Sequence, residues 1–168
     1  MLRDKQFHGN MKYKDNFIKK IISGGQTGVD RAALDIAIEL KIPHGGYCPK
    51  DRQAEDGIIP SKYNLIENDS IKYSDRTRQN VESSEGTLIL HTGIISNGTE
   101  ITKEYCIKRV KPLMILNILS ESKSCRLNFN HWLKKNSINI LNVAGPKESV
   151  GAIYNVSKNV LRHLLCDE

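Results

Sequence analysis

The sequence predicts an α/β protein, a Rossmann-like three-layer sandwich with a central, mainly parallel sheet of about five strands. Short β-prone or apolar segments alternate along the chain with segments whose apolar residues recur every three or four positions. Glycine-containing turns stand between strand and helix at several of these changes. Alternation of this kind implies right-handed crossovers, and therefore a parallel sheet covered by helices on both faces.

The predicted elements follow one another in strict alternation. Strands are expected over residues 17–23, 42–48, 86–91, 112–118 and 138–144. Helices are expected over residues 29–41, 75–84, 99–109, 127–135 and 149–165. Residues 49–64 are polar and follow no periodicity, and long loops of this kind are often functional.

Length and composition favour one intracellular domain. The 168 residues suffice for a single core, so we expect a polar tail over residues 1–16 and one ligand-binding domain over residues 17–168. No stretch reaches the roughly 18 apolar residues of a membrane span, and the N-terminus lacks the apolar core of a secretory signal. We expect a cytoplasmic protein that contacts no membrane. The net charge of +6 is spread along the chain, so nucleic acid is not an expected partner.

The first candidate ligand loop follows the first predicted strand. Gly24, Gly25 and Gly28 let the backbone turn sharply and approach a ligand. The next helix offers free N–H groups and the positive end of its dipole, which together suit a phosphate. Gln26 and Thr27 could add hydrogen bonds. The alternative is that the glycines only make a tight turn.

Two well-known phosphate motifs do not fit this loop. A dinucleotide fingerprint needs a glycine where Ser23 stands, and an acidic residue at the end of the second strand, which this sequence lacks. A P-loop needs lysine and then serine or threonine after Gly28, where Val29 and Asp30 occur. NAD-dependent chemistry and nucleoside triphosphate hydrolysis are therefore disfavoured.

Charged residues gather in the second candidate loop. Lys50 and Arg52 could clamp a phosphate, and Glu55 or Asp56 could read the ring nitrogens of a heterocycle. Composition alone favours a solvated loop instead. Two further candidates, on one face of the helix that follows, are Arg76 and Asn80.

The third candidate loop leads into the helix after the strand over 86–91. Asn97, Gly98 and Thr99 stand where that helix should begin, so Thr99 either caps the helix or helps to bind a phosphate. The loop after the last strand repeats this arrangement, with Lys147 as a counter-ion. We expect no metal site, because the histidines lack paired ligand spacing. We also identify no catalytic residue, because neither a GxSxG elbow nor a Cys–His pair is present.

Six sequence blocks occur in order along most of the chain. They read GGQTGVDRAALD, CPKDRQAEDGIIP, RTRQNV, EGTLIL, NGTEIT and NVAGPKES. In this order they resemble the molybdenum carrier family, a Rossmann-like group related to the Lonely Guy phosphoribohydrolases. The resemblance implies a homo-oligomer that binds molybdenum cofactor, a phosphorylated pterin dithiolene carrying molybdate. It also implies delivery of that cofactor to a molybdoenzyme.

The sequence departs from the related phosphoribohydrolases at the third loop. Those enzymes have a glutamate three residues after the threonine, where Thr102 stands here. The GlyGlyThr that is common in the carrier family is here Asn97, Gly98 and Thr99. Our first hypothesis is a non-catalytic carrier that holds the phosphorylated pterin at the carboxyl ends of the strands. The alternatives are a nucleotide sensor or a nucleoside monophosphate hydrolase. The acid–base candidates for that hydrolase are Glu55, Asp56, Glu100 and Glu104.

Overall fold

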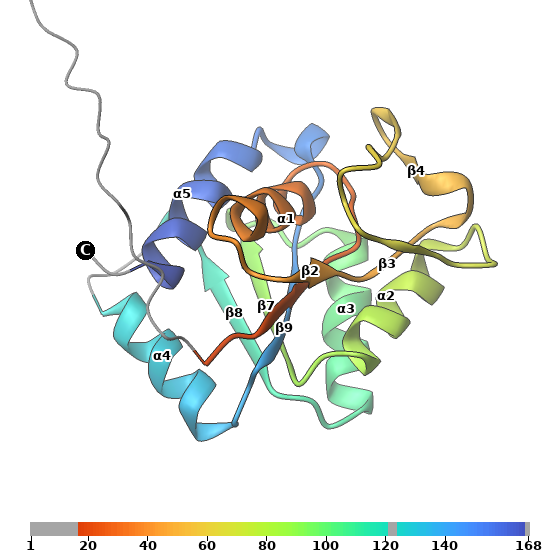
Figure 1. Cartoon of the computed structure of the whole chain (residues 1–168). Helices are drawn as coiled ribbons and strands as arrows, with labels where there is room; N and C mark the ends of the chain where they lie inside the picture. The colour runs from red at the N-terminus through yellow and green to blue at the C-terminus, as the bar shows by residue number, and fades with distance from the viewer. Residues whose placement is uncertain (1–16, 121–123, 167–168) are drawn as a thin grey trace, which may run out of the picture.

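A five-stranded sheet, in which all neighbouring strands are parallel, forms the centre of the fold (Figure 1). The computed structural model describes residues 17–120 and 124–166, so the predicted tail over 1–16 lies outside the described residues. The strands are β1 (Lys20–Ile22), β2 (His44–Gly45), β7 (Gly86–His91), β8 (Leu113–Asn117) and β9 (Ile140–Ala144). Their order across the sheet is β2-β1-β9-β7-β8.

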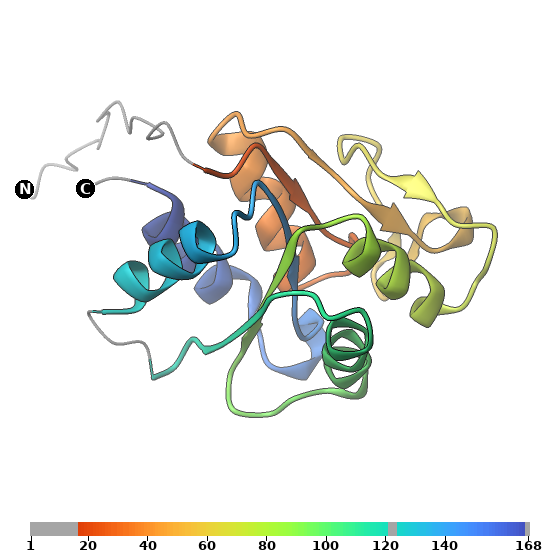
Figure 2. The same ribbon diagram turned by 90° about the horizontal axis from the view of Figure 1, so that it is seen from below.

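Helices cover both faces of this sheet (Figures 1 and 2). One layer consists of α1 (Val29–Glu39), α4 (Cys125–Lys135) and α5 (Tyr154–Leu165), and the other of α2 (Tyr73–Glu82) and α3 (Asn97–Lys108). This arrangement confirms the predicted Rossmann-like three-layer sandwich. Among the described residues, no helix combines the length and apolar character needed to cross a membrane.

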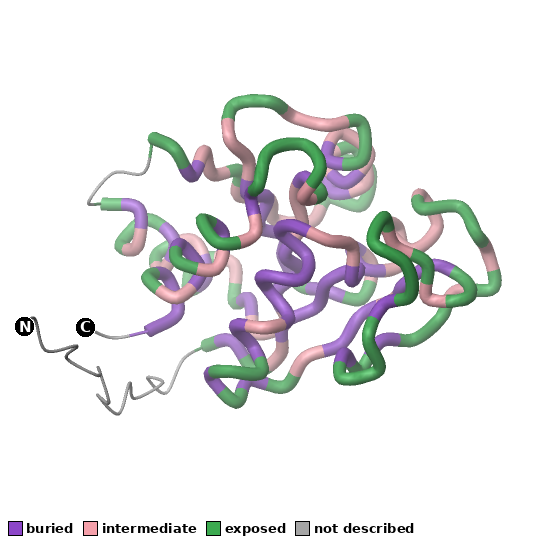
Figure 3. Tube along the Cα trace, turned by 90° about the horizontal axis from the view of Figure 1, so that it is seen from above, coloured by how far each residue is buried: buried purple, intermediate pink, exposed green. Residues whose placement is uncertain are grey.

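The core lies between the sheet and the α1–α4–α5 layer. β7 is buried along almost its whole length, as expected of a strand covered on both faces. Helix α1 is buried from Val29 to Leu34 because it packs against both the sheet and α5. Figure 3 shows this buried centre, with the exposed residues on the outer loops and on the outward sides of the helices. A second, smaller core of Leu34, Cys48, Ile59, Tyr63 and Leu65 lies beneath the 49–64 loop.

The predicted strand over 42–48 is wrong in one respect, because the structure divides it in two. β2 pairs with β1, whereas β3 (Tyr47–Cys48) leaves the sheet and pairs with β6 (Ile66–Glu67). The division falls at Gly46, which has a φ of 129° and lies so close to Ser23 that a Cβ would stand 2.2 Å from the Ser23 carbonyl oxygen. Only glycine fits this bend.

The helix predicted over 149–165 starts later than expected. Residues Glu148–Val150 form a separate 3₁₀ turn (η2), and Ala152 has a φ of 49°, so α5 begins at Tyr154. Conversely, the helix predicted from Thr99 begins at Asn97, with Ser96 before it in an extended conformation. The 49–64 loop contains the 3₁₀ turn η1 (Lys50–Arg52) and a short hairpin of β4 (Gln53–Ala54) and β5 (Gly57–Ile58).

Candidate functional site

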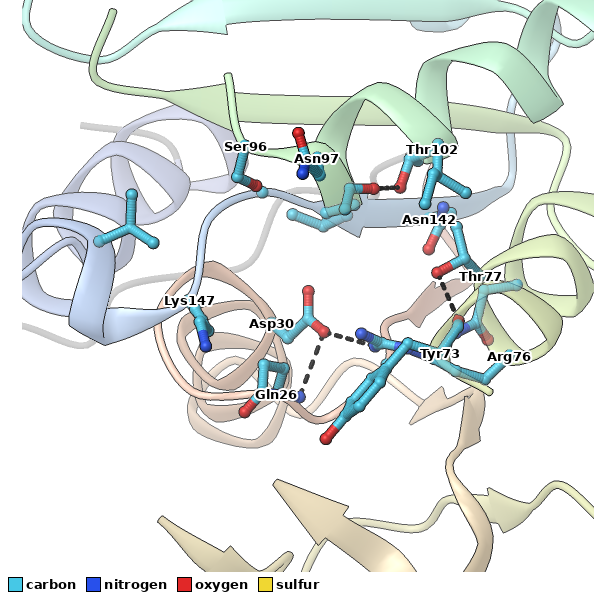
Figure 4. Close-up of a pocket in the computed structure, with 18 of the residues that line it drawn as sticks. Gln26, Asp30, Tyr73, Arg76, Thr77, Ser96, Asn97, Thr102, Asn142 and Lys147 are labelled. Carbon is cyan, nitrogen blue, oxygen red and sulfur yellow. Dashed lines mark hydrogen bonds and ion pairs between the residues drawn. The ribbon is translucent and has the colours of Figure 1, made fainter. Parts of the chain in front are cut away.

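A cavity of about 530 Å³ opens beside the carboxyl ends of the central strands (Figure 4). Its walls come from the loop after β1, the start of α2, the start of α3, the end of β9 and the loop after β9. Its position agrees with the general rule that ligands of open α/β sheets bind outside the carboxyl ends of the strands. Its volume suits a ligand of nucleotide size.

The cavity brings together many of the residues selected from the sequence. Those that line it are Gly24, Gln26, Glu55, Arg76, Asn80, Asn97, Gly98, Thr102 and Lys147. Those that do not are Gly25, Thr27, Gly28, Lys50, Arg52, Asp56 and Thr99. Of the second group, Thr27, Gly28 and Asp56 line a more open hollow on the other side of Glu55.

Three backbone amides of the first loop and the start of α1 donate hydrogen bonds within the protein. The amide of Gln26 donates to Asp30 Oδ2 at 3.2 Å, and the amide of Thr27 donates to Gln26 Oε1 at 3.0 Å. The amide of Val29 donates to the Pro146 carbonyl at 3.2 Å. These three donors are therefore already used, and the loop forms a fixed platform at the start of α1.

Two glycines of this loop are required by what lies against them. A Cβ on Gly24 would stand 1.4 Å from Arg76 Nη1, so the missing side chain makes room for the guanidinium. A Cβ on Gly28 would stand 2.5 Å from the Pro146 carbonyl oxygen, and Gly28 has a φ of 80°. Gly25, with a φ of 78°, turns toward the small core under the 49–64 loop. The glycines thus permit close packing of protein against protein.

A buried ion pair lies in one wall of the cavity. Arg76 Nη1, from α2, lies 2.8 Å from Asp30 Oδ2, from the first turn of α1, and the two side chains are only 13% and 6% exposed. The ring of Tyr73 lies over the guanidinium, with 5.6 Å between Arg76 Cζ and the ring centroid. Arg76 Nε is buried and has no hydrogen-bond partner among the described residues. Figure 4 shows Asp30, Arg76 and Tyr73 together on this wall.

Glu55 fastens the β4–β5 hairpin to both the first and the last loop. Its carboxylate accepts hydrogen bonds from the Thr27 hydroxyl, from the Ser149 amide at 3.0 Å and from Ser149 Oγ at 2.6 Å. Lys147 Nζ lies 3.4 Å away. Desolvation acts to raise the pKa of Glu55, but these hydrogen bonds outweigh it and lower the pKa from 4.5 to about 2.

The remaining charged residues of the second loop also have partners within the fold. The Arg52 guanidinium donates to the carbonyl oxygens of Ile59, Pro60, Tyr63 and Leu65, at distances of 3.0 to 3.3 Å. Asp56 pairs with Arg31 through two contacts of 2.9 Å. Lys50 is exposed. The structure therefore gives Arg52 a role in shaping its own loop.

Asn80 lines the cavity, but its side-chain amide hydrogen-bonds the backbone of Tyr47. Its Oδ1 accepts from the Tyr47 amide at 2.7 Å, and its Nδ2 donates to the Tyr47 carbonyl at 3.0 Å. The Asn80 side chain thus pairs with the Tyr47 backbone as a neighbouring strand would, and it holds β3 against α2.

Two threonines of α3 hydrogen-bond near the start of that helix. The Thr102 hydroxyl donates to the Gly98 carbonyl at 3.0 Å, and the buried Thr99 hydroxyl lies 3.0 Å from Ser96 Oγ.

The start of α3 differs from the start of α1. Ser96 accepts the amides of Thr99 and Glu100 through its carbonyl oxygen, at 2.9 and 3.0 Å. The amides of Asn97 and Gly98, the two residues directly before Thr99, donate no hydrogen bond within the described residues. Because both residues line the cavity, the positive end of this helix dipole is directed at a space that a ligand can enter.

Sequence reasoning missed several residues that line the cavity. Asp30 falls within the predicted helix over 29–41, and Tyr73 falls just outside the predicted helix over 75–84. Asn142, which is buried in β9 and donates to Thr87 Oγ1 at 3.2 Å, carried a usable signal because it is a polar residue within an apolar strand.

The match to known proteins covers nearly all of this architecture. The model of the circularly permutated YpsA SLOG family matches residues 21–165. The chain belongs to this family. A crystal structure from Syntrophus aciditrophicus, of a protein named "Putative molybdenum carrier protein", superposes with a TM-score of 0.85 and is 41% identical. The match covers 88% of this chain and 95% of that one, and it confirms the resemblance found in the sequence. No curated protein matches the chain.

Arg52 provides a test of how this SLOG-family fold holds its second loop. Replacing Arg52 by alanine removes the donor to all four carbonyl groups, and we expect the free energy of unfolding to fall by about 2 kcal/mol. Urea unfolding followed by circular dichroism measures the change. Lys50→Ala, which removes an exposed cation from the same loop, should change stability by less than about 0.5 kcal/mol. Equal effects of the two substitutions would contradict the role given to Arg52.

The lowered pKa of Glu55 predicts a pH-dependent contribution to stability. Because the folded pKa lies below the unfolded value, the contribution is complete above pH 4.5 and disappears as the pH falls toward 2. Glu55→Gln should therefore lower the free energy of unfolding by about 1 kcal/mol at neutral pH, and by progressively less in acid. The effect is small because solvent screens this exposed group. Unfolding curves at several pH values test this. Glu104→Gln, at an exposed position of α3, is the matched control, and a cost of Glu55→Gln that did not shrink in acid would refute the assignment.

Proposed function

We propose that this protein is a carrier that binds molybdenum cofactor, a phosphorylated pterin, in the cavity at the carboxyl ends of the strands. The observation that carries the proposal is the start of α3, where two residues that line a cavity of about 530 Å³ have amides that donate no hydrogen bond within the described part of the chain. The 41% identity to a protein named as a molybdenum carrier supports the choice of ligand.

The phosphate of the ligand belongs at the start of α3. Helix N-termini bind phosphate through free amides and through the helix dipole, and here the amides are those of Asn97 and Gly98. The Ser96 side chain, which also lines the cavity, adds a hydroxyl. The first loop, which the sequence favoured for this role, has already used the amides of Gln26 and Thr27.

The charges of the cavity are compatible with such a ligand. Its two cationic side chains, Arg76 and Lys147, each contact a carboxylate, so the cavity carries little net charge. Lys147 is 49% exposed, and its contact with Glu55 is long at 3.4 Å, so it can turn toward a phosphate at little cost. Arg76 is fixed against Asp30 and does not need to move.

The acid–base candidates of the alternative, hydrolytic reading are poorly placed for catalysis. Glu55 and Asp56 are held in contacts that stabilise the loops, and neither Glu100 nor Glu104 lines the cavity. This favours binding without turnover. The cavity would also accept a nucleotide, because a phosphate and a polar heterocycle are common to both ligands. A homo-oligomer and a molybdoenzyme that receives the cofactor remain predictions from the resemblance.

Substitutions at Gly98 test where the phosphate binds. A Cβ at this position meets nothing within 4 Å, so the fold accepts a side chain there. Aspartate in the first turn of a helix is favourable for the helix, but its charge repels a bound phosphate. We expect Gly98→Asp to weaken neopterin monophosphate binding at least roughly tenfold, equivalent to about 1.4 kcal/mol.

Isothermal titration calorimetry measures this change, and Gly98→Asn is the control of equal size without the charge. The asparagine variant should retain most of the affinity. If the aspartate variant bound neopterin monophosphate as tightly as the asparagine variant, the phosphate would not lie at the start of α3.

A further inference from the structure

Asp30 places a buried carboxylate at the wall of the cavity opposite the start of α3. Its side chain is only 6% exposed, yet it lines the cavity. Figure 4 shows Ser96 and Asn97 on one wall and Gln26, Asp30 and Tyr73 on the other. A carboxylate repels a phosphate, so the cavity has one end suited to an anion and another end suited to a hydrogen-bond donor.

The two oxygens of this carboxylate have different environments. Oδ2 accepts from Arg76 Nη1 at 2.8 Å and from the Gln26 amide at 3.2 Å. Oδ1 has no hydrogen-bond partner among the described residues, and Figure 4 shows it directed into the cavity. A buried carboxylate oxygen is a strong acceptor, and it selects for a donor on whatever binds beside it.

The direction of Asp30 is fixed by groups from two different segments, helix α2 and the first loop. Arg76 reaches it from α2 across the backbone of Gly24, and the Gln26 amide reaches it from the first loop. The Tyr73 ring lies over the guanidinium and is itself 47% exposed. Oδ1 therefore stands in a set position in a cavity that the exposed Tyr73 ring also lines, and this combination of an acceptor and an aromatic ring suits a flat heterocycle.

We propose that Asp30 determines specificity by accepting a hydrogen bond from the amino group of a 2-amino-4-oxopyrimidine ring. Pterin and guanine share this ring edge. A ring that carries a carbonyl or only a hydrogen in place of the 2-amino group cannot donate this hydrogen bond to Asp30. The inference rests on the proposed function, because it assumes that a phosphorylated heterocycle occupies this cavity with its phosphate at α3. It adds the identity of the ring edge and the residue that reads it.

GMP and IMP separate this inference from the proposed function. The two nucleotides carry the same phosphate and differ only by the 2-amino group of GMP. A charge-assisted hydrogen bond to Asp30 should make GMP bind at least roughly tenfold more tightly than IMP to the wild-type protein. Isothermal titration calorimetry with each nucleotide measures the ratio.

Asp30→Asn tests the residue itself. The asparagine oxygen will turn toward the two donors, Arg76 and the Gln26 amide, and will leave its NH₂ group facing the cavity. We expect the preference for GMP over IMP to disappear or reverse. Asp35→Asn makes the same change in the same helix, but Asp35 accepts from Lys62, Tyr63 and Tyr154 outside this cavity, so its variant should keep the preference. Thermal unfolding of both variants shows whether they are folded.

The outcomes distinguish the two proposals. Equal binding of GMP and IMP to the wild-type protein, or a preference that survives in folded Asp30→Asn, overturns the role of Asp30 while the phosphate site stands. If Asp30→Asn does not fold, the wild-type ratio decides. If GMP, IMP and neopterin monophosphate all fail to bind, the proposed function falls, and this inference falls with it.

Discussion

The ion pair between Asp30 and Arg76 joins the two helical layers across the end of β1. One partner belongs to α1 and the other to α2, and both side chains are almost completely buried. Removing one member of a buried pair leaves the other charge desolvated and unpaired, which is usually very costly. The pair therefore constrains its neighbours: Gly24 must lack a side chain, and the first loop must turn so that the Gln26 amide meets the same carboxylate.

Similar polar contacts fix the other walls of the cavity. Glu55 links the β4–β5 hairpin to the loops after β1 and β9. Arg52 holds the 49–64 loop by donating to carbonyl groups along it. Most of the charged residues of the second loop that were candidates for ligand binding thus stabilise the site before any ligand arrives. A site built in advance loses little conformational entropy on binding. Within the described residues, the groups left for the ligand include the start of α3, Lys147 and one oxygen of Asp30.

The sequence predicted the alternation of strands and helices, because apolar periodicity reports directly which residues face the core. It also predicted the position of the cavity, which follows from a parallel sheet alone. It could not predict which partner each charged residue chooses. From the sequence, Arg52 and Glu55 are either ligand contacts or solvated charges. Only the three-dimensional course of residues 49–65 brings carbonyls to Arg52 and hydroxyls to Glu55. Likewise, the bend at Gly46 depends on contact with Ser23, which is distant in sequence.

Asp30 illustrates a further limit of sequence reasoning. Its place in the first turn of a helix is unremarkable, since acidic residues are common there. Its significance arises from Arg76, which is 46 residues away, and from the exposure of one oxygen to the cavity. Such a residue is found only when the loops that follow different strands are seen together.

Native mass spectrometry of the purified protein tests the central claim most directly. The spectra would be recorded alone, with molybdenum cofactor, and with AMP, ADP and NAD. The account predicts a stoichiometric adduct with molybdenum cofactor that survives when the nucleotides compete for the same cavity. A protein that binds the nucleotides but forms no adduct with molybdenum cofactor would contradict the carrier function.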